Sequence, residues 1–255
     1  MNVENYFNIR RFALLIKNDI LKQYRTFLTA IGAVTGILLA IILLSHKSSG
    51  FWNFHLVFYP LVLFIGGFIL SSFAFAELHH PQKSYVYLTL PCSILEKFVC
   101  KFLLTSIGYI IISAGLFYLF SIIAAGLNML LFKQTFPVFN PFDDIILKNI
   151  RIYMVTQSIF LFAAVYFKKN NLIKMILSLF VLSIVCSAFA TLVLRLTYWD
   201  YWNNGFLIFS NSSELGFYAE PFFIKLSEIF EFLFWWIMAP YFWILSFLRL
   251  KETEV

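Results

Sequence analysis

The sequence predicts an all-helical integral membrane protein with six transmembrane helices, and three observations lead to this fold class. Of its 255 residues, 61% are hydrophobic and only 13% are charged, whereas about a quarter of a soluble domain is charged. The mean hydropathy is +0.84. The apolar residues also gather into stretches of about 20, the length that an α-helix needs to cross the hydrocarbon core of a bilayer.

Six stretches have this length, and we predict that the whole chain, residues 1–255, forms one membrane domain. Backbone polar groups in lipid must be satisfied internally, so the spans are helices. Pro240 is expected to bend the last of them. The predicted spans are residues 26–45, 54–76, 98 to about 120 with apolar character on to 132, 150–167, 172–194 and 229–248.

A further helix is predicted ahead of the first span, over residues 5–25. Apolar residues recur there at helical spacing, and Arg10, Lys17, Lys22 and Arg25 fall largely on other positions. This pattern is typical of a basic amphipathic helix lying in the inner membrane interface. The alternative is an ordinary extension of the first span. The apolar positions are Ile9, Phe12, Ala13, Ile16, Ile20 and Phe27.

The connection between the last two spans, residues 195–228, is too long for a turn and too polar for two more spans. It is rich in Trp, Tyr and Phe, which favour the membrane interface. Asp200, Glu214 and Glu220 argue against deep immersion. We therefore expect short, partly re-entrant helices in the outer leaflet.

The distribution of Lys and Arg predicts the orientation. With the N-terminus in the cytoplasm, 13 of the 19 basic residues lie on the inner side, as the positive-inside rule requires. Both termini then face the cytoplasm. The basic residues are spread between apolar runs rather than gathered in a patch, so the net charge of +6 does not indicate nucleic-acid binding.

Catalytic and cofactor motifs are missing from the sequence. No G-x-x-x-x-G-K-[ST] loop is present, so the chain is not expected to bind ATP. His79 and His80 follow Glu77, but adjacent side chains point apart on a helix, so no metal site is predicted. The three cysteines, Cys92, Cys100 and Cys186, have neither metal nor redox spacing.

The cores of the predicted spans are apolar and contain no Asp, Glu, Lys or Arg. Ion-coupled transporters usually keep such a residue in the membrane, and intramembrane enzymes need acid, His or metal groups there. Both classes are therefore disfavoured, although Glu228 and Glu231 stand at the outer edge of the sixth span.

One more polar segment interrupts the long apolar stretches: "YVYLTLPCSILEKFVCK", from Tyr85 to Lys101. Ser93 and Glu96 have the spacing of a capping box, which satisfies free N–H groups at a helix start. Pro91 disfavours helical geometry just before it. We predict a compact cytoplasmic elbow over residues 77–97, leading into the third span and suited to docking a cytoplasmic partner.

Small residues recur every fourth position in the first span, at Gly32, Gly36 and Ala40. Such a stripe permits close helix approach. It is equally compatible with packing inside the chain and with a dimer interface.

The order of these elements resembles the membrane subunits of type-2 ATP-binding-cassette exporters. The local similarity is in "GGFILSSFAFAEL" (residues 66–78) and "LTLPCSILEKFVCKFL" (residues 88–103). The resemblance implies that the elbow carries a coupling helix for a separate ATPase subunit, which holds the ATP and Mg. It also implies a second permease subunit, identical or not, with the first spans near the interface.

We therefore predict a permease subunit in a bacterial inner membrane, surrounded by lipid. It is expected to have no catalytic residues and no cofactor of its own. Two other classes remain open: a secondary transporter or channel that works without a partner, and a non-transporting scaffold or immunity subunit. An intramembrane enzyme is a weaker third. The expected partner-coupling residues are His79, His80, Pro81, Gln82, Lys83, Ser84, Tyr85, Pro91, Ser93 and Glu96.

Overall fold

The computed structural model describes residues 7–44, 54–79, 84–85, 87, 89–133, 136–168, 171–197, 225 and 228–253. These residues form helices and connections, without a strand among them. The α-helices are α1 (Ile9–Leu44), α2 (Phe54–Ser72), α4 (Ile94–Leu103), α5 (Tyr109–Phe132), α6 (Asp144–Tyr166), α7 (Asn171–Thr197) and α10 (Ala239–Thr253).

Six helices in this part of the chain are long and apolar enough to cross a membrane, which confirms the predicted number of spans. The chain therefore has the construction of a multi-pass membrane protein. The helices are Tyr24–Ile42, Phe54–His79, Ile94–Phe132, Asp144–Tyr166, Asn171–Phe189 and Glu228–Thr253.

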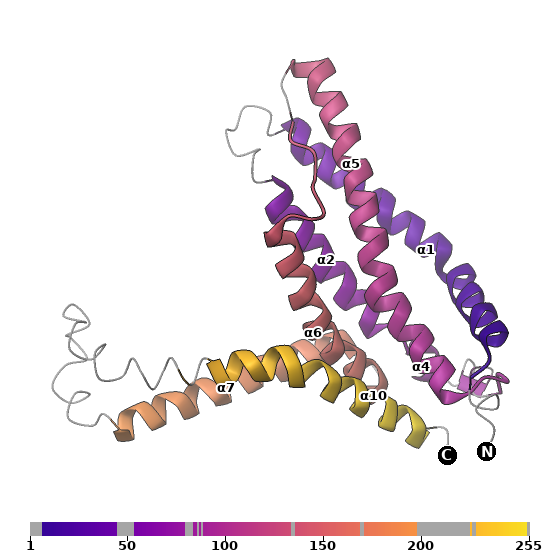
Figure 1. Cartoon of the computed structure of the whole chain (residues 1–255), viewed down its shortest axis with the longest axis vertical. Helices are drawn as coiled ribbons and strands as arrows, with labels where there is room; N and C mark the ends of the chain where they lie inside the picture. Colours follow the sequence, from indigo (N-terminus) through magenta and orange to yellow (C-terminus); the bar gives the residue numbers. More distant parts are fainter. Residues whose placement is uncertain are drawn as a thin grey trace.

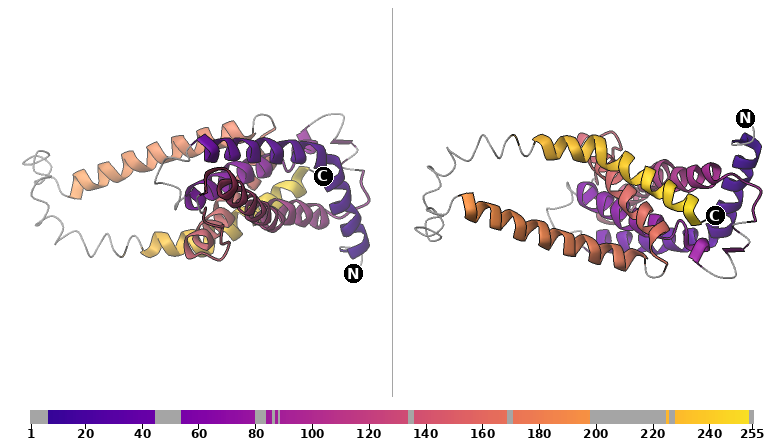
Figure 2. Two further views of the ribbon diagram at one scale, coloured as in Figure 1. Left: turned by 90° about the horizontal axis from the view of Figure 1, so that it is seen from above. Right: turned by 90° about the horizontal axis from the view of Figure 1, so that it is seen from below.

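The helices separate into two groups that meet at α6. Helices α1, α2, α4 and α5 run alongside one another, whereas α7 and the helix that ends as α10 extend away from them at a large angle (Figure 1). Helix α6 packs against α2 on one side and α10 on the other. The beginning of α1 and the end of α10 lie at the same end of the molecule (Figures 1 and 2), which we call the terminal end.

Helix α1 contains both the predicted amphipathic helix and the predicted first span. It is continuous from Ile9 to Leu44, so no break divides the predicted amphipathic helix from the first span. Figure 2 shows its first turns leading away at an angle to the remainder. Much of the apolar surface of these turns is uncovered by protein, with Ile9 75% and Ile20 52% exposed.

The third span combines three helical segments. Helix α4 is followed by the π-helical residues Leu104–Gly108 and then by α5 without interruption. A second π-helical stretch, Leu233–Met238, precedes α10 and the predicted irregularity at Pro240. Proline lacks the N–H that the preceding turn would bond, so regular α-helical spacing is lost around it.

The fourth span starts earlier than predicted. Helix α6 begins at Asp144 because Asp143 acts as its N-cap, with a carboxylate oxygen accepting from Ile145 N at 2.9 Å. Lys148 and Arg151 lower the hydropathy of these first two turns, which is why the apolar stretch alone points to residue 150 as the start.

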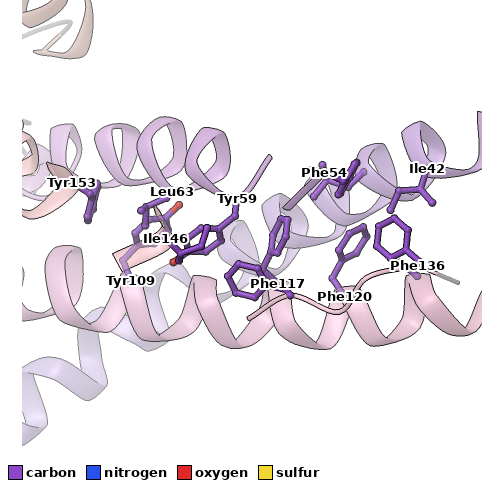
Figure 3. Close-up of a cluster of buried hydrophobic side chains, with 13 residues drawn as sticks. Ile42, Phe54, Tyr59, Leu63, Tyr109, Phe117, Phe120, Phe136, Ile146 and Tyr153 are labelled. Carbon is purple, nitrogen blue, oxygen red and sulfur yellow. The ribbon is translucent and has the colours of Figure 1, made fainter. Parts of the chain in front are cut away.

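The main core is a largely aromatic cluster between α1, α2, α5 and α6 (Figure 3). The connection from α5 to α6 returns across it, so Phe136 and Phe139 are buried. His55 of α2 lies among their rings and contacts the Pro137 carbonyl oxygen. This packing ties α2 and α5 together at the end of the molecule opposite the terminal end.

Two adjacent glycines of α2 receive tyrosine side chains. A Cβ atom at Gly66 would overlap the Tyr109 hydroxyl, and one at Gly67 would overlap the Tyr153 ring. Tyr109 Oη donates to the Val62 carbonyl oxygen at 2.8 Å. The glycines thus allow tyrosines from α5 and α6 to reach the backbone of α2.

Candidate functional site

The predicted elbow lies at the terminal end and forms the candidate site. It opens with the 3₁₀ turn Ala76–His79 and ends at the start of α4. Within it, Tyr85 is 74% exposed, Pro91 is exposed and Ser84 is half-buried. Four of the expected coupling residues lie outside the described residues: His80, Pro81, Gln82 and Lys83.

The predicted capping box at the start of α4 is confirmed. Glu96 N donates to Ser93 Oγ at 3.1 Å, and Ser93 N donates to Glu96 Oε2 at 2.9 Å. The two residues satisfy each other's free N–H groups, which fixes the direction in which the chain leaves the elbow.

The same carboxylate also holds the start of α1. Asn8 N donates to Glu96 Oε1 at 2.6 Å, and Arg11 Nη2 lies 3.2 Å from that oxygen. Glu96 is fully buried. Because free N–H groups at a helix start favour negative charge, one carboxylate serves the N-terminal ends of two helices, α1 and α4.

The elbow also covers Lys97. Lys97 is 1% exposed, and its ammonium group lies 5.1 Å from the centroid of the Tyr87 ring. A cation over an aromatic face is attracted by the ring quadrupole. Since Tyr87 belongs to the elbow and is itself buried, this contact fastens the elbow to the first turn of α4.

Two more ion pairs connect α1 to this region. Lys101 Nζ lies 2.8 Å from Asp19 Oδ2, with both side chains less than a tenth exposed. Lys22 Nζ lies 3.2 Å from Glu77 Oε1. Together with Glu96, these pairs fix the first half of α1 against the elbow and α4; we call this set the α1–elbow clamp.

Sequence reasoning missed the buried pair of the clamp. Asp19 and Lys101 are 82 residues apart in the sequence, so no local pattern joins them. A signal is present, because Asp19 is the one acid between residues 5 and 25, a strongly basic segment, and an acid at such a position has a nearby cation as its natural partner.

His79 is directed toward α6. Its Nε2 lies 2.8 Å from the Ala164 carbonyl oxygen of α6, which can only accept a hydrogen bond. Asn171 Nδ2 donates to the same carbonyl at 3.4 Å and to the Ser72 carbonyl at 3.3 Å. The last turn of α6 thus bonds to both of the connections at the terminal end.

A polar cluster surrounds the π-helical segment between α4 and α5. Gln157 Nε2 donates to Thr105 Oγ1 at 2.9 Å, and Ser106 Oγ donates to Gln157 Oε1 at 3.2 Å. Tyr153 Oη donates to the Thr105 carbonyl at 2.7 Å. Insertions of this kind in helices often occur at functional positions, and here α6 supplies the hydrogen bonds that hold it.

The small-residue stripe of α1 does not pack against the described residues of the chain. Gly32, Gly36 and Ala40 are exposed, and a Cβ atom added at either glycine would meet nothing within 4 Å among the described residues. Internal packing of the stripe is therefore not found within the part of the chain that the structure describes.

The cysteines are free thiols, with Cys100 buried and Cys186 exposed. Burial raises the pKa of the half-buried Cys92 thiol, and the Glu96 carboxylate adds to that effect. Within the described residues, no group of three or more His, Cys, Asp or Glu could hold a metal ion.

Comparison of the chain with protein-family models, with curated proteins and with solved structures finds no match. The fold itself defines the class of protein: an all-helical protein with six helices long and apolar enough to cross a membrane.

Proposed function

We propose that this chain is the membrane-spanning permease subunit of an ATP-driven exporter in a bacterial inner membrane. It forms the translocation path with a second permease subunit and receives motion at the elbow from a separate ATPase chain. Both termini and the elbow then lie in the cytoplasm.

The observation that carries the proposal is the α1–elbow clamp. A segment that only reversed the chain direction would not need a buried carboxylate bonded to two helix starts and a second, buried ion pair. Buried charges are costly unless paired and hydrogen-bonded. Such a rigid connection is what the transfer of force from a partner to two spans requires.

The placement of the elbow supports the orientation. It lies at the terminal end, beside the beginning of α1 and the end of α10 (Figure 1), so the predicted cytoplasmic segments share one side. Tyr85, 74% exposed, is available to a partner there. Buried Glu96 and inward-facing His79 would act on a partner through the elbow that they hold.

The experiment is purification of the tagged chain from its native membrane. The quantity measured is the ATPase activity that co-purifies with it. Replacing Gln82, Lys83, Ser84 and Tyr85 together by Ala should leave the amount of membrane-inserted protein near normal and remove the co-purifying hydrolysis. Tyr166→Ala is the control, since Tyr166 is a 51% exposed tyrosine at the end of α6, beside the short connection to α7.

Hydrolysis that co-purifies with the parent and the control but not with the elbow variant supports the proposal. Equal hydrolysis in all three means that this segment does not dock the ATPase. If no hydrolysis accompanies the parent chain but flux persists in liposomes, the partner-free transporter replaces the proposal; without flux, the scaffold or immunity subunit does.

A further inference from the structure

An apolar groove runs along α1, between that helix and α2, α4 and α5. It consists of two hollows of about 320 Å³ and about 460 Å³, within the size range of small-molecule sites. The hollows share lining residues, Phe27 and Ile31 of α1 and Tyr109 and Ile112 of α5, so they form one continuous groove. Figure 1 shows α1 following α4 and α5 along this path.

A positive charge in excess, that of Arg25, lies beside the end of the groove nearer the terminal end. Asp19 and Lys101 line it and neutralise each other at 2.8 Å, and Lys22 is paired with Glu77. Arg25 has no carboxylate within ion-pair distance among the described side chains. Its Nε donates to Tyr24 Oη at 2.9 Å, and Tyr24 lines the groove.

We propose that this groove binds one acyl chain of an anionic inner-leaflet phospholipid, with the phosphate at Arg25. A guanidinium matches two phosphate oxygens at once, and basic positions at the cytoplasmic boundary attract anionic lipid headgroups. The inference uses the cytoplasmic placement of the elbow but needs neither an ATPase nor transport.

The groove is long enough for a chain from one leaflet. Tyr24 begins the candidate span, which places Arg25 at the membrane boundary. The second hollow continues along α1 to Ile41, and Val34, within it, lies about 15 Å along the helix from Tyr24. This is about half of the ~30 Å hydrocarbon core, the depth that the acyl chains of one leaflet fill.

A second copy of the chain is a poorer occupant. Residues at positions 27, 31, 34 and 38 line the groove. Successive residues are about 100° apart around a helix, so Gly32, Gly36 and Ala40 lie on roughly the opposite face of α1. The surface suited to helix–helix contact and the groove are therefore separate.

The test is native mass spectrometry of the purified full-length chain titrated with palmitoyl-oleoyl phosphatidylglycerol. Phosphatidylcholine with the same chains measures the headgroup preference, and soluble glycerol phosphate tests the headgroup alone. We expect phosphatidylglycerol to be retained in preference to phosphatidylcholine and glycerol phosphate not to displace it.

Two matched pairs of variants locate the site. Arg25→Gln should weaken phosphatidylglycerol retention roughly tenfold, as expected for a lost charge-assisted hydrogen bond, whereas Lys17→Gln removes an exposed cation of the same helix without this effect. Ile112→Trp fills the groove and should reduce retention of both lipids. Ile111→Trp changes the neighbouring residue, which is 66% exposed and does not line either hollow, and should retain both.

The proposal is overturned if Ile112→Trp and Ile111→Trp retain lipid equally, or if the two charge variants lose it equally. Displacement by glycerol phosphate would indicate a site for free phosphate instead. A change in oligomeric mass in Ile112→Trp alone would assign the groove to a second copy. Each of these results leaves the ATPase co-purification unaffected, so the two proposals fail separately.

Discussion

The carboxylate of Glu96 accepts hydrogen bonds from two backbone N–H groups that belong to different helix starts, at Asn8 and Ser93. The capping box could be read from Ser93 and Glu96 because both partners lie within one turn. The bond to Asn8 could not, since it depends on how α1 folds back across α4. At the residue scale, sequence therefore predicted the local half of the Glu96 interactions and missed the long-range half.

Glu96→Ala should lower the free energy of unfolding by roughly 2–4 kcal/mol, because it leaves two N–H groups in partly buried hydrogen bonds and the Arg11 guanidinium without their acceptor. Chemical unfolding in detergent, followed by helical circular dichroism, measures this. Glu252→Ala is the control: Glu252 is 63% exposed in its pair with Arg249, so its removal should cost less than about 1 kcal/mol. Equal costs for the two variants would refute the role assigned to Glu96.

Gly66→Ala should destabilise the protein by roughly 1–3 kcal/mol, the usual cost of overpacking, because the new methyl group overlaps the Tyr109 hydroxyl. Tyr109→Phe removes that hydroxyl and leaves ring carbon Cζ 3.2 Å from the methyl position. The double variant should therefore be more stable than the sum of the single changes by about 1 kcal/mol or more.

Two comparisons sharpen this glycine test. Gly67→Ala should not be rescued by Tyr153→Phe, because ring carbons of Tyr153 also occupy the methyl position. Gly126→Ala, in α5, meets nothing within 4 Å and should stabilise the helix by up to about 1 kcal/mol. A rescue of both glycine variants, or of neither, would contradict the geometry.

At the element scale, hydropathy located the spans but not every helix end. The start of α6 follows from the Asp143 cap rather than from apolar residues. The π-helical turn at Leu104–Gly108 cannot be recognised in the hydropathy pattern of the third span. Its stabilising partners, Tyr153 and Gln157, come from another helix. Helical irregularity that depends on a neighbouring element cannot be read from one segment.

The attachment of α1 to α4 should depend on the buried Asp19–Lys101 pair. Asp19→Leu or Lys101→Met alone should cost about 3–5 kcal/mol, because each leaves an unpaired buried charge. The double variant should recover most of this loss, since apolar side chains are tolerated in place of a buried ion pair. Unfolding in detergent again provides the measurement.

The matched control for this pair is Lys22→Met. Its partner Glu77 is 24% exposed and Lys22 itself 42% exposed, so water screens the charge left behind and the cost should stay below about 1 kcal/mol. If the double variant is as unstable as the worse single variant, the pair is not what attaches α1 to α4.

At the scale of the whole molecule, composition and basic-residue distribution were enough to predict the number of spans. They were not enough to predict that the chain exposes so much apolar surface after folding. On α7, for example, Leu177, Phe180 and Phe189 are all more than 60% exposed. Lipid or another protein chain has to cover such surface, and an isolated chain contains neither.

The small-residue stripe of α1 is the whole-molecule feature with the most direct test. Because Gly36 has open space around it, Gly36→Ile should leave the stability of a single chain unchanged, whereas a close helix contact between two copies would be blocked. We expect the molecular mass in detergent to fall from dimer to monomer at equal protein concentration. Gly126→Ile is the control, since Gly126 is equally open on α5, and it should remain dimeric. Monomers for the parent chain would remove the stripe from the proposed assembly of identical subunits, and dimers for all three proteins would place the interface elsewhere.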